Sequence, residues 1–403
     1  MALGIYRPVR ILLPKLESFS TEFEDPNMKD SMEHIQPLLG SSIDEIYINT
    51  LNVTPGPTNV EDFVVSLARL CPNIGSLNVE CPPDFISEPL SAAIRELVCR
   101  LHQLRVINVA RLSLTPELVI HLLKSNSVQY LQQIEVSKDI RILELKKIFL
   151  KSHDIFPKLV VLEFCAHSWE LAADVLDLFE CHKIHQLVVN SALGDWKVTP
   201  TSIPQTLTSF AKFSESLSRH PSVSSITCLS LSGSISVPLE LPGQGLRSIP
   251  SVFKCLLHLK SIQSLHLSLG CESNLDDPWL AEAAPAWPHL RLLKIQEDGS
   301  LQPSVTLAGL LPLLKFCPKL SYLTIPINAK PFSATLLSSA VINTTIATSL
   351  AFPASLIESP SKVFRCLTFM FPMLHSIECS GVHEQGNQDW KKVQKLISHS
   401  SLR

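Results

Sequence analysis

One short phrase recurs through the whole chain: an apolar residue, two variable residues, a second apolar residue, one variable residue and a third apolar residue. The copies are Leu16/Phe19 (incomplete), Ile43/Ile46/Ile48, Ile74/Leu77/Val79, Leu104/Ile107/Val109, Leu131/Ile134/Val136, Leu159/Leu162/Phe164, Ile184/Leu187/Val189, Ile226/Leu229/Leu231, Ile262/Leu265/Leu267, Leu290/Leu293/Ile295, Leu320/Leu323/Ile325, Ala347/Leu350/Phe352 and Leu374/Ile377/Cys379. Most steps between copies run from 25 to 31 residues. A period of that size predicts an array of stacked units.

Proline is a second, independent marker of the same period. It lies two residues before the first apolar position in six copies, at Pro14, Pro72, Pro157, Pro288, Pro318 and Pro372. About one such coincidence is expected by chance from the 29 prolines of the chain. Because proline cannot continue a helix and favours extended geometry in the preceding residue, each proline predicts the end of a helix and the start of a strand.

Amphipathic stretches with helical spacing lie between the phrases. Examples are Val60 to Leu70, Leu90 to Leu101, Pro116 to Lys124, Trp169 to Glu180 and Thr306 to Phe316. Short strands that alternate with helices at a fixed period predict an α/β leucine-rich-repeat solenoid, curved, with parallel strands on the concave face and helices on the convex face. We expect irregular repeats, because the asparagine that usually follows the strand is nearly absent and only Asn328 matches its place.

We expect residues 1–403 to form a single solenoid domain. The two long steps imply longer repeats over residues 190–261, with surface loops at 199–204 and 237–243, which are rich in proline. The segment 389–403 contains a short basic amphipathic stretch. We interpret it as a C-terminal helix that caps the open end of the array.

Two copies of a Cys-Pro phrase suggest a family. Cys71-Pro-Asn-Ile-Gly-Ser-Leu-Asn-Val79 and Cys317-Pro-Lys-Leu-Ser-Tyr-Leu-Thr-Ile325 resemble the fungal F-box/leucine-rich-repeat proteins. The resemblance implies substrate-presenting repeats, joined through an N-terminal F-box to the Skp-type adaptor of a cullin-RING ubiquitin ligase. This chain shows no F-box motif, so we expect adaptor binding only if an F-box is encoded upstream of Met1.

Composition narrows the function further. The chain is 45% hydrophobic and 18% charged with a formal net charge of -3, which indicates a folded protein without the basic footprint of a nucleic-acid binder. Its apolar runs are shorter than a membrane span and no signal peptide is evident, so we expect a cytoplasmic or nuclear protein with no membrane partner.

Candidate chemistry is sparse. No phosphate-binding loop, nucleophile elbow or zinc-protease motif is present, and we expect no enzyme, no cofactor and no metal site. Cys181, His182 and His185 lack the converging geometry that zinc needs. The acidic row Glu170, Asp174 and Asp177 lies opposite the apolar side of its helix, which indicates a solvated surface. A remote alternative is an unrecognised enzyme site in 190–261, testable by whether Asp195, His220 and Ser232 converge.

The leading hypothesis is protein–protein recognition, as the substrate-binding region of an F-box-type receptor; the alternative is a stand-alone leucine-rich-repeat scaffold. Strand side chains alternate, so the residues between the apolar positions must face outward. They are Tyr47, Asn49, Asn78, Glu80, Asn108, Glu135, Glu163, Asn190, His266, Lys294, Gln296 and Glu378. This surface is amide-rich and most acidic in its first half, which favours a basic or amide-bearing polypeptide segment as partner. The open alternative is that the insertion loops make the contact.

Overall fold

The computed structural model of the chain describes residues 13–22, 35–49, 60–81, 88–136, 145, 156–179, 181–191, 203–233, 253–269, 275–296, 303–330, 347–381 and 384–400. The chain divides into two compact units, Met1–Cys165 and Ala166–Arg403. Each unit is a row of parallel strands, one strand per repeat, with neighbouring strands in chain order. The fold is therefore a leucine-rich-repeat solenoid, as the period of the apolar phrase predicts.

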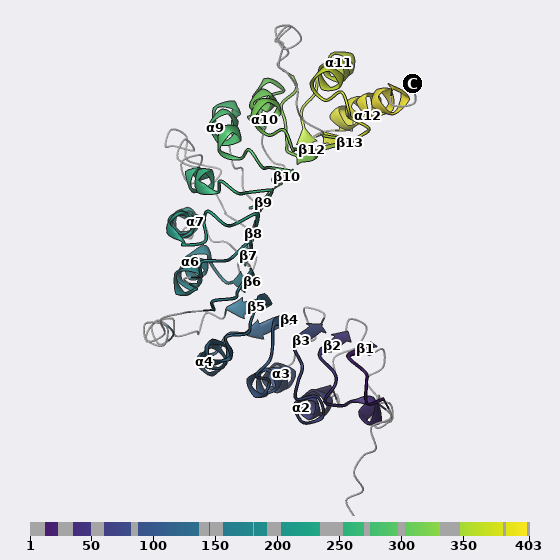
Figure 1. The fold of residues 1–403 in the computed structure, drawn as a ribbon. Coiled ribbons are helices and arrows are strands. Elements are labelled where there is room, and N and C mark those ends of the chain that lie inside the picture. The colour runs from purple at the N-terminus through teal and green to yellow at the C-terminus, as the bar shows by residue number, and fades with distance from the viewer. Residues whose placement is uncertain are drawn as a thin grey trace, which may run out of the picture. The chain divides into compact units, whose positions relative to one another are not determined.

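In the first unit, short strands alternate with helices or other connections. The elements are β1 (Ser18–Glu22), the 3-10 helix η1 (Gln36–Leu38), β2 (Glu45–Asn49), α2 (Val60–Leu70), β3 (Ser76–Glu80), α3 (Glu88–Arg100), β4 (Val106–Ser113), α4 (Pro116–Ser125), β5 (Tyr130–Val136) and β6 (Val161–Ala166), which reaches the boundary of the unit. Helices α2, α3 and α4 lie on one side of the strands (Figure 1).

A backbone contact repeats at the start of the strands. The carbonyl of the residue before one strand accepts two N–H groups from the next repeat. The Gly75 carbonyl accepts from Arg105 N–H at 2.7 Å and from Val106 N–H at 3.0 Å. The carbonyls of Glu17, Asp44, Arg105 and Gln129 do the same in the first unit, and those of His185, Thr227, Gln263, Arg291 and Thr348 in the second. A carbonyl has two lone pairs, so one peptide group can hold two donors of its neighbour.

The apolar phrase supplies the core of both units. Leu77, Leu162, Leu265 and Leu323, the middle residues of their copies, are fully buried, as predicted. The incomplete first copy is different, because Leu16 and Phe19 are only half-buried. A row of strands therefore buries one side chain in two, and the alternate side chains are left on the other side of the sheet.

Proline marks the turn between the end of a helix and the start of a strand, as its chemistry predicts. Helix α2 ends at Leu70, Cys71 is buried, Pro72 lies in a turn, and β3 begins at Ser76. Cys71 N–H donates to the Leu67 carbonyl at 2.8 Å, which closes the last turn of the helix. Burial raises the pKa of the Cys71 thiol to about 11 and that of Cys317 to about 12. Both cysteines are reduced, and their thiols behave as small apolar groups.

One repeat of the first unit has a register that we assigned wrongly. We placed Ile134 as its middle residue, but Leu131 pairs with Ile107 and Ile134 pairs with Leu112. The first apolar position of that copy is therefore Val128, three residues before the predicted Leu131. The reason is an irregularity between Asn108 and Leu112 on β4, matched on β5 by Gln133 in the left-handed region at φ 57°. Such a bulge shifts every later side chain along the strand.

The second unit continues the same alternation. Its elements are α6 (Trp169–Leu178), β7 (Gln186–Ser191), α7 (Ile203–Arg219), β8 (Cys228–Gly233), η4 (Phe253–His258), β9 (Ser264–Ser268), α9 (Asp277–Ala283), η5 (Ala284–Ala286), β10 (Leu292–Gln296), η6 (Ala308–Leu310), α10 (Leu311–Phe316), β11 (Tyr322–Thr324), β12 (Ser349–Ser355), α11 (Pro360–Met370), β13 (Ser376–Gly381) and α12 (Glu384–Ser400). Strands β7 to β13 pair in parallel, and the helices again lie on one side of them (Figure 1).

The longer repeats contain a helix that we did not predict. Residues Ile203 and Pro204, which we placed in a loop, form the first turn of α7. Proline is tolerated there because the first N–H groups of a helix have no partner inside it. The rest of the two predicted loops, 199–202 and 237–243, lies outside the described residues, so their surface position stays a prediction.

Aromatic side chains join successive repeats in the helical layer of the second unit. Trp169 of α6 contacts Phe210 of α7 with ring centroids 4.8 Å apart, and Phe210 contacts Phe253 of η4 at 5.6 Å. The series continues from Phe253 to Trp279 at 6.4 Å and from Trp279 to Trp287 at 5.6 Å. All five rings are buried. Large buried rings thus make up a continuous part of the core in this layer.

Helix α12 covers the last strand of the second unit. It begins at Glu384 rather than at Asp389 and packs against β13 and α11. Trp390, Val393 and Ile397 are its buried residues, and the Trp390 indole donates to the Ser355 carbonyl at 3.0 Å. This packing is what a capping helix requires. The prediction of a single domain over 1–403 stays a prediction, because each unit is described by itself.

A core substitution tests the repeat assignment. Leu265→Ala removes a fully buried side chain from the middle of its phrase, and we expect a loss of about 2 to 5 kcal/mol in the free energy of unfolding. Urea denaturation followed by circular dichroism measures it. Gln263→Ala, at an exposed position two residues earlier, is the matched control and should change stability by less than about 0.5 kcal/mol. Equal losses in the two variants would contradict the assignment.

Candidate functional site

The candidate site is the sheet surface that faces away from the helices; we call it the strand face of each unit. In the first unit its side chains align in rows across the strands. Tyr47, Asn78, Asn108 and Gln132 occupy paired positions on β2, β3, β4 and β5. Glu22, Asn49 and Glu80 form the next row on β1, β2 and β3. The structure therefore brings together the residues that we predicted on β2, β3 and β4: Tyr47, Asn49, Asn78, Glu80 and Asn108.

Hydrogen bonds connect these rows. The Tyr47 hydroxyl donates to Glu80 Oε2 at 2.7 Å, and Asn49 Nδ2 donates to Glu22 Oε1 at 3.4 Å. The hydrogen bond to Glu80 is the main cause that raises the pKa of the Tyr47 phenol. Asn108 lies one strand further on, and its side-chain oxygen is buried without a donor among the described residues. This surface therefore offers a partner several acceptors.

The bulge in β4 and β5 changes the predicted site. Glu135 pairs with Ser113 and lies past the bulge, so it is not in the row of Asn108. Gln132 takes the place that we assigned to Glu135, and its side chain hydrogen-bonds to Glu163. The spacing Val128-x-x-Leu131 fits the repeat as well as Leu131-x-x-Ile134 does, so the sequence left both registers open.

The described side chains of this strand face are acidic. Its charged members are Glu22, Glu45, Glu80, Glu135 and Glu163, and no lysine or arginine is among the described side chains that project from these strands away from the helices. Tyr130, at the start of β5, adds an aromatic ring that is 38% exposed. Carboxylates beside exposed aromatic rings suit lysine and arginine side chains, which bind both groups.

The strand face of the second unit is hydroxyl- and amide-rich. His266 is its best-connected residue: Ser230 Oγ lies 3.2 Å from Nδ1, and Gln296 Oε1 lies 3.3 Å from Nε2. An amide oxygen only accepts, so Nε2 carries the proton and Nδ1 accepts from the Ser230 hydroxyl. Burial lowers the pKa of His266, the hydrogen bond to Gln296 opposes this, and the ammonium of Lys294 on the neighbouring strand lowers it further.

The remaining predicted residues of this unit lie along the same strands. Asn190 of β7 pairs with Ser232 of β8, whose hydroxyl donates to the Asn190 side-chain oxygen. Glu378 of β13 is exposed. The polar groups here are thus largely bonded to one another, in contrast to the excess of carboxylates on the strand face of the first unit.

The alternative enzyme site does not assemble around His220 and Ser232. His220 is buried; its Nε2 donates to the Phe179 carbonyl at 2.8 Å, and its Nδ1 accepts from Ser222 N–H at 3.1 Å. The Ser222 hydroxyl in turn donates to the Cys181 carbonyl and accepts from Ile184 N–H. His220 therefore links two repeats through backbone groups, while Asp195 lies outside the described residues.

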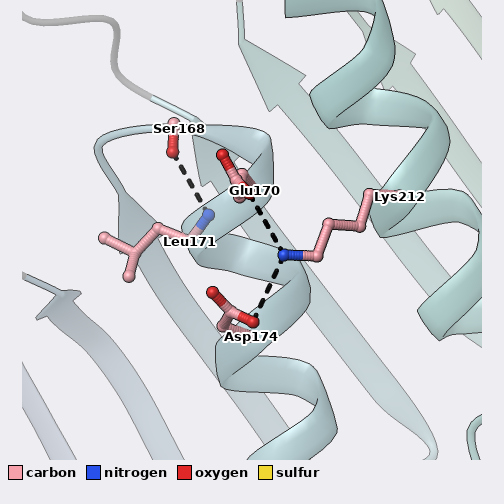
Figure 2. A network of polar contacts seen from close by, with 5 residues as sticks. All are labelled: Ser168, Glu170, Leu171, Asp174 and Lys212. Carbon is pink, nitrogen blue, oxygen red and sulfur yellow. Dashed lines mark hydrogen bonds and ion pairs between the residues drawn. The ribbon is translucent and has the colours of Figure 1, made fainter. Parts of the chain in front are cut away.

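The acidic row on α6 is exposed at Glu170 and Asp177, as predicted, and two of its carboxylates also form ion pairs. The Lys212 ammonium of α7 lies 3.2 Å from Glu170 Oε1 and 3.4 Å from Asp174 Oδ1 (Figure 2). Ser168 caps the same helix by accepting from Leu171 N–H at 3.2 Å. We missed these ion pairs because we did not predict α7. Among the described residues, no group of three histidine, cysteine or acidic side chains is arranged to hold a metal ion.

Solved structures of other proteins are distantly similar to this chain. No family model matches the chain, and no curated protein matches it. The Rad7 and Elc1 complex in yeast matches with 12% sequence identity and a TM-score of 0.46, over 88% of this chain and 81% of that chain. The leucine-rich repeat-containing protein LegL7 from Legionella pneumophila matches with 11% identity and a TM-score of 0.32, over 94% and 98%. The fold assignment rests on the strand order and register described above.

In the part of the chain that the structure describes, no helix has the length and apolar content to cross a membrane.

Glu163 gives a test that depends on pH. Burial raises the pKa of its carboxyl, and the hydrogen bond from Gln132 only partly opposes this. Because the folded pKa is above the unfolded one, the ionised carboxylate costs stability at neutral pH, and that cost vanishes as the pH falls through the folded pKa. We therefore expect Glu163→Gln to melt above wild type at pH 7, with the difference shrinking towards pH 4.

Circular dichroism melts across this pH range measure the effect. Glu117→Gln, at an exposed position on α4, is the control for removing one carboxylate. A difference between Glu163→Gln and wild type that is the same at both ends of the range would contradict the assignment.

Proposed function

We propose that this chain recognises another protein by binding a lysine- or arginine-bearing segment on the strand face of the first unit. The observation that carries the proposal is the set of five glutamates on this face, with no cation among its described side chains. Extended segments suit such a surface because it has hydrogen-bonding groups in regular rows. Neighbouring strands are about 4.8 Å apart, so the rows present acceptors at short, even intervals.

Charge reversal tests this surface. The triple variant Glu45→Lys, Glu80→Lys and Glu135→Lys avoids the half-buried Glu163 and should fold. We expect it to lose about tenfold or more in affinity for a fluorescein-labelled peptide of alternating lysine and serine, measured by anisotropy at roughly 50 mM salt. The loss should be smaller at roughly 150 mM, where the Debye length is about 8 Å.

The control variant carries the same change in net charge on the helical side of the same unit: Asp62→Lys, Glu96→Lys and Glu117→Lys, all at exposed positions. It should bind the peptide within about twofold of wild type. Equal losses in the two variants would mean that only net charge matters, and the proposed surface would be wrong.

We further propose that the recognised protein is a substrate of a cullin-RING ubiquitin ligase, with this chain as the substrate-binding region of an F-box-type receptor. The support is the resemblance of the Cys71 and Cys317 phrases to fungal F-box/leucine-rich-repeat proteins. In both phrases the structure has the cysteine buried at the end of a helix and a strand after the proline turn. The second candidate, a stand-alone scaffold, has the same surface and no ligase.

The two roles predict different effects of this chain on the half-life of the protein that it binds. Depletion of this protein from cells should lengthen the half-life of the partner and reduce its ubiquitin conjugates if the chain belongs to a receptor. Cells that regain the charge-reversed triple variant should behave like depleted cells, whereas cells with the helical-side control should not. An unchanged half-life would leave the scaffold role as the better description.

A further inference from the structure

A second charged surface lies along one edge of the second unit, where each helix turns into the next strand. We call it the turn edge; it comprises residues 181–185, 220–227, 259–263, 287–291, 317–321 and 371–375. Its cations are Lys183, Lys260, Arg291 and Lys319, and its exposed histidines are His182, His185, His289 and His375. None of these six segments contains an aspartate or a glutamate.

The backbone beneath these side chains is fixed. Arg291 N–H donates to the Gln263 carbonyl at 2.8 Å, and the Arg291 carbonyl accepts from Ser321 N–H at 2.8 Å and from Tyr322 N–H at 3.1 Å. The Ser321 hydroxyl also donates to that carbonyl, at 3.0 Å. The turns are thus held in line at the spacing of the strands, about 4.8 Å per repeat. The backbone positions from which these side chains project are therefore set before any partner binds.

Ion pairing at this edge differs between the two units. Lys183, Lys260, Arg291 and Lys319 are exposed, and none forms an ion pair in the part of the chain that the structure describes. The same edge of the first unit is arranged differently, because Arg105 pairs there with Asp44. Gly75 lies between them, and a Cβ on it would meet Arg105 Nη2 at 2.8 Å. Arg105 is thus paired within the fold, whereas no cation of the turn edge has an ion pair among the described residues.

Helix dipoles explain only part of this pattern. Cations are favoured at helix C-termini, which is where these turns lie. The turns that lead into the strands of the first unit also carry cations, Lys15, Arg105 and Lys158, but there they lie among the acidic residues Glu17 and Asp44. The lack of acidic residues in the second unit therefore needs another reason, and an anionic partner supplies one.

We propose that the turn edge of the second unit binds an acidic segment of another protein, rich in aspartate or glutamate. A nucleic-acid strand is the less suited anion, because binding of single strands needs exposed aromatic rings for base stacking. The aromatic residues of these turns, Trp287 and Phe371, are buried. This surface is separate from the strand face on which the proposed function rests, and it takes a partner segment of the opposite charge.

Charge reversal on the full chain tests the proposal. The variant Lys260→Glu, Arg291→Glu and Lys319→Glu should bind a fluorescein-labelled peptide of alternating glutamate and serine about tenfold or more weakly than wild type, by anisotropy at roughly 50 mM salt. The control variant Lys124→Glu, Lys391→Glu and Lys395→Glu has the same net charge at exposed positions on helices, away from the turns. It should bind within about twofold of wild type.

Thermal melts of both variants show whether they fold. If the cations only stabilise the helix ends, the substitutions would lower the melting temperature without changing the affinity for the peptide. Three results overturn the proposal: no binding of the acidic peptide to wild type at low salt, equal losses in the two variants, or tighter binding of a thymidine oligonucleotide of equal charge. The last result would assign the turn edge to nucleic acid.

Discussion

The structure depends on one backbone interaction, the carbonyl that accepts two N–H groups from the following repeat at the start of a strand. It recurs at Glu17, Asp44, Gly75, Arg105 and Gln129 in the first unit, and the second unit has the same contact. These positions carry acidic, basic, amide and glycine residues, so the interaction does not depend on the side chain. A buried peptide group left without a partner costs about 1 to 3 kcal/mol. Each repeat therefore needs its neighbour to satisfy its backbone as well as to cover its apolar side chains.

Side chains add to this backbone ladder between repeats at a few places. Where a side chain does bridge repeats, its type varies: the Ser42 hydroxyl donates to the Leu16 carbonyl at 2.9 Å, and His220 and Ser222 bridge α6 and β7 to the next repeat. The peptide groups bond directly between repeats, so this contact does not require one particular side chain. The same freedom lets the connections differ, from the 3-10 helix η4 to the long α7, without loss of strand register.

The sequence predicted the parts of the fold that repeat and missed the parts that do not. Middle residues such as Leu265 could be predicted because burial of one face imposes a fixed spacing. The shift from Ile134 to Leu131 could not, because both are apolar and the spacing fits either until the bulge at Gln133 is known. For the candidate site, alternation placed Tyr47, Asn78 and Asn108 in one row, but no pattern in the chain showed that Gln132 replaces Glu135. The partner of Glu170, Lys212, lies 42 residues away on a helix whose start we took for a loop.

The two strand faces differ in what a partner must displace. On the second unit, hydrogen bonds link His266 to Ser230 and to Gln296, and the Ser232 hydroxyl donates to the Asn190 side-chain oxygen. A partner that binds there must break those bonds and replace them, so its net gain per contact is small. On the first unit, a carboxylate can accept about four hydrogen bonds, and the Tyr47 hydroxyl donates one to Glu80. Lysine and arginine side chains can form charge-assisted hydrogen bonds to such carboxylates without breaking the hydrogen bond from Tyr47. The carboxylates of the first unit therefore suit recognition of a basic segment better than the hydroxyls of the second unit do.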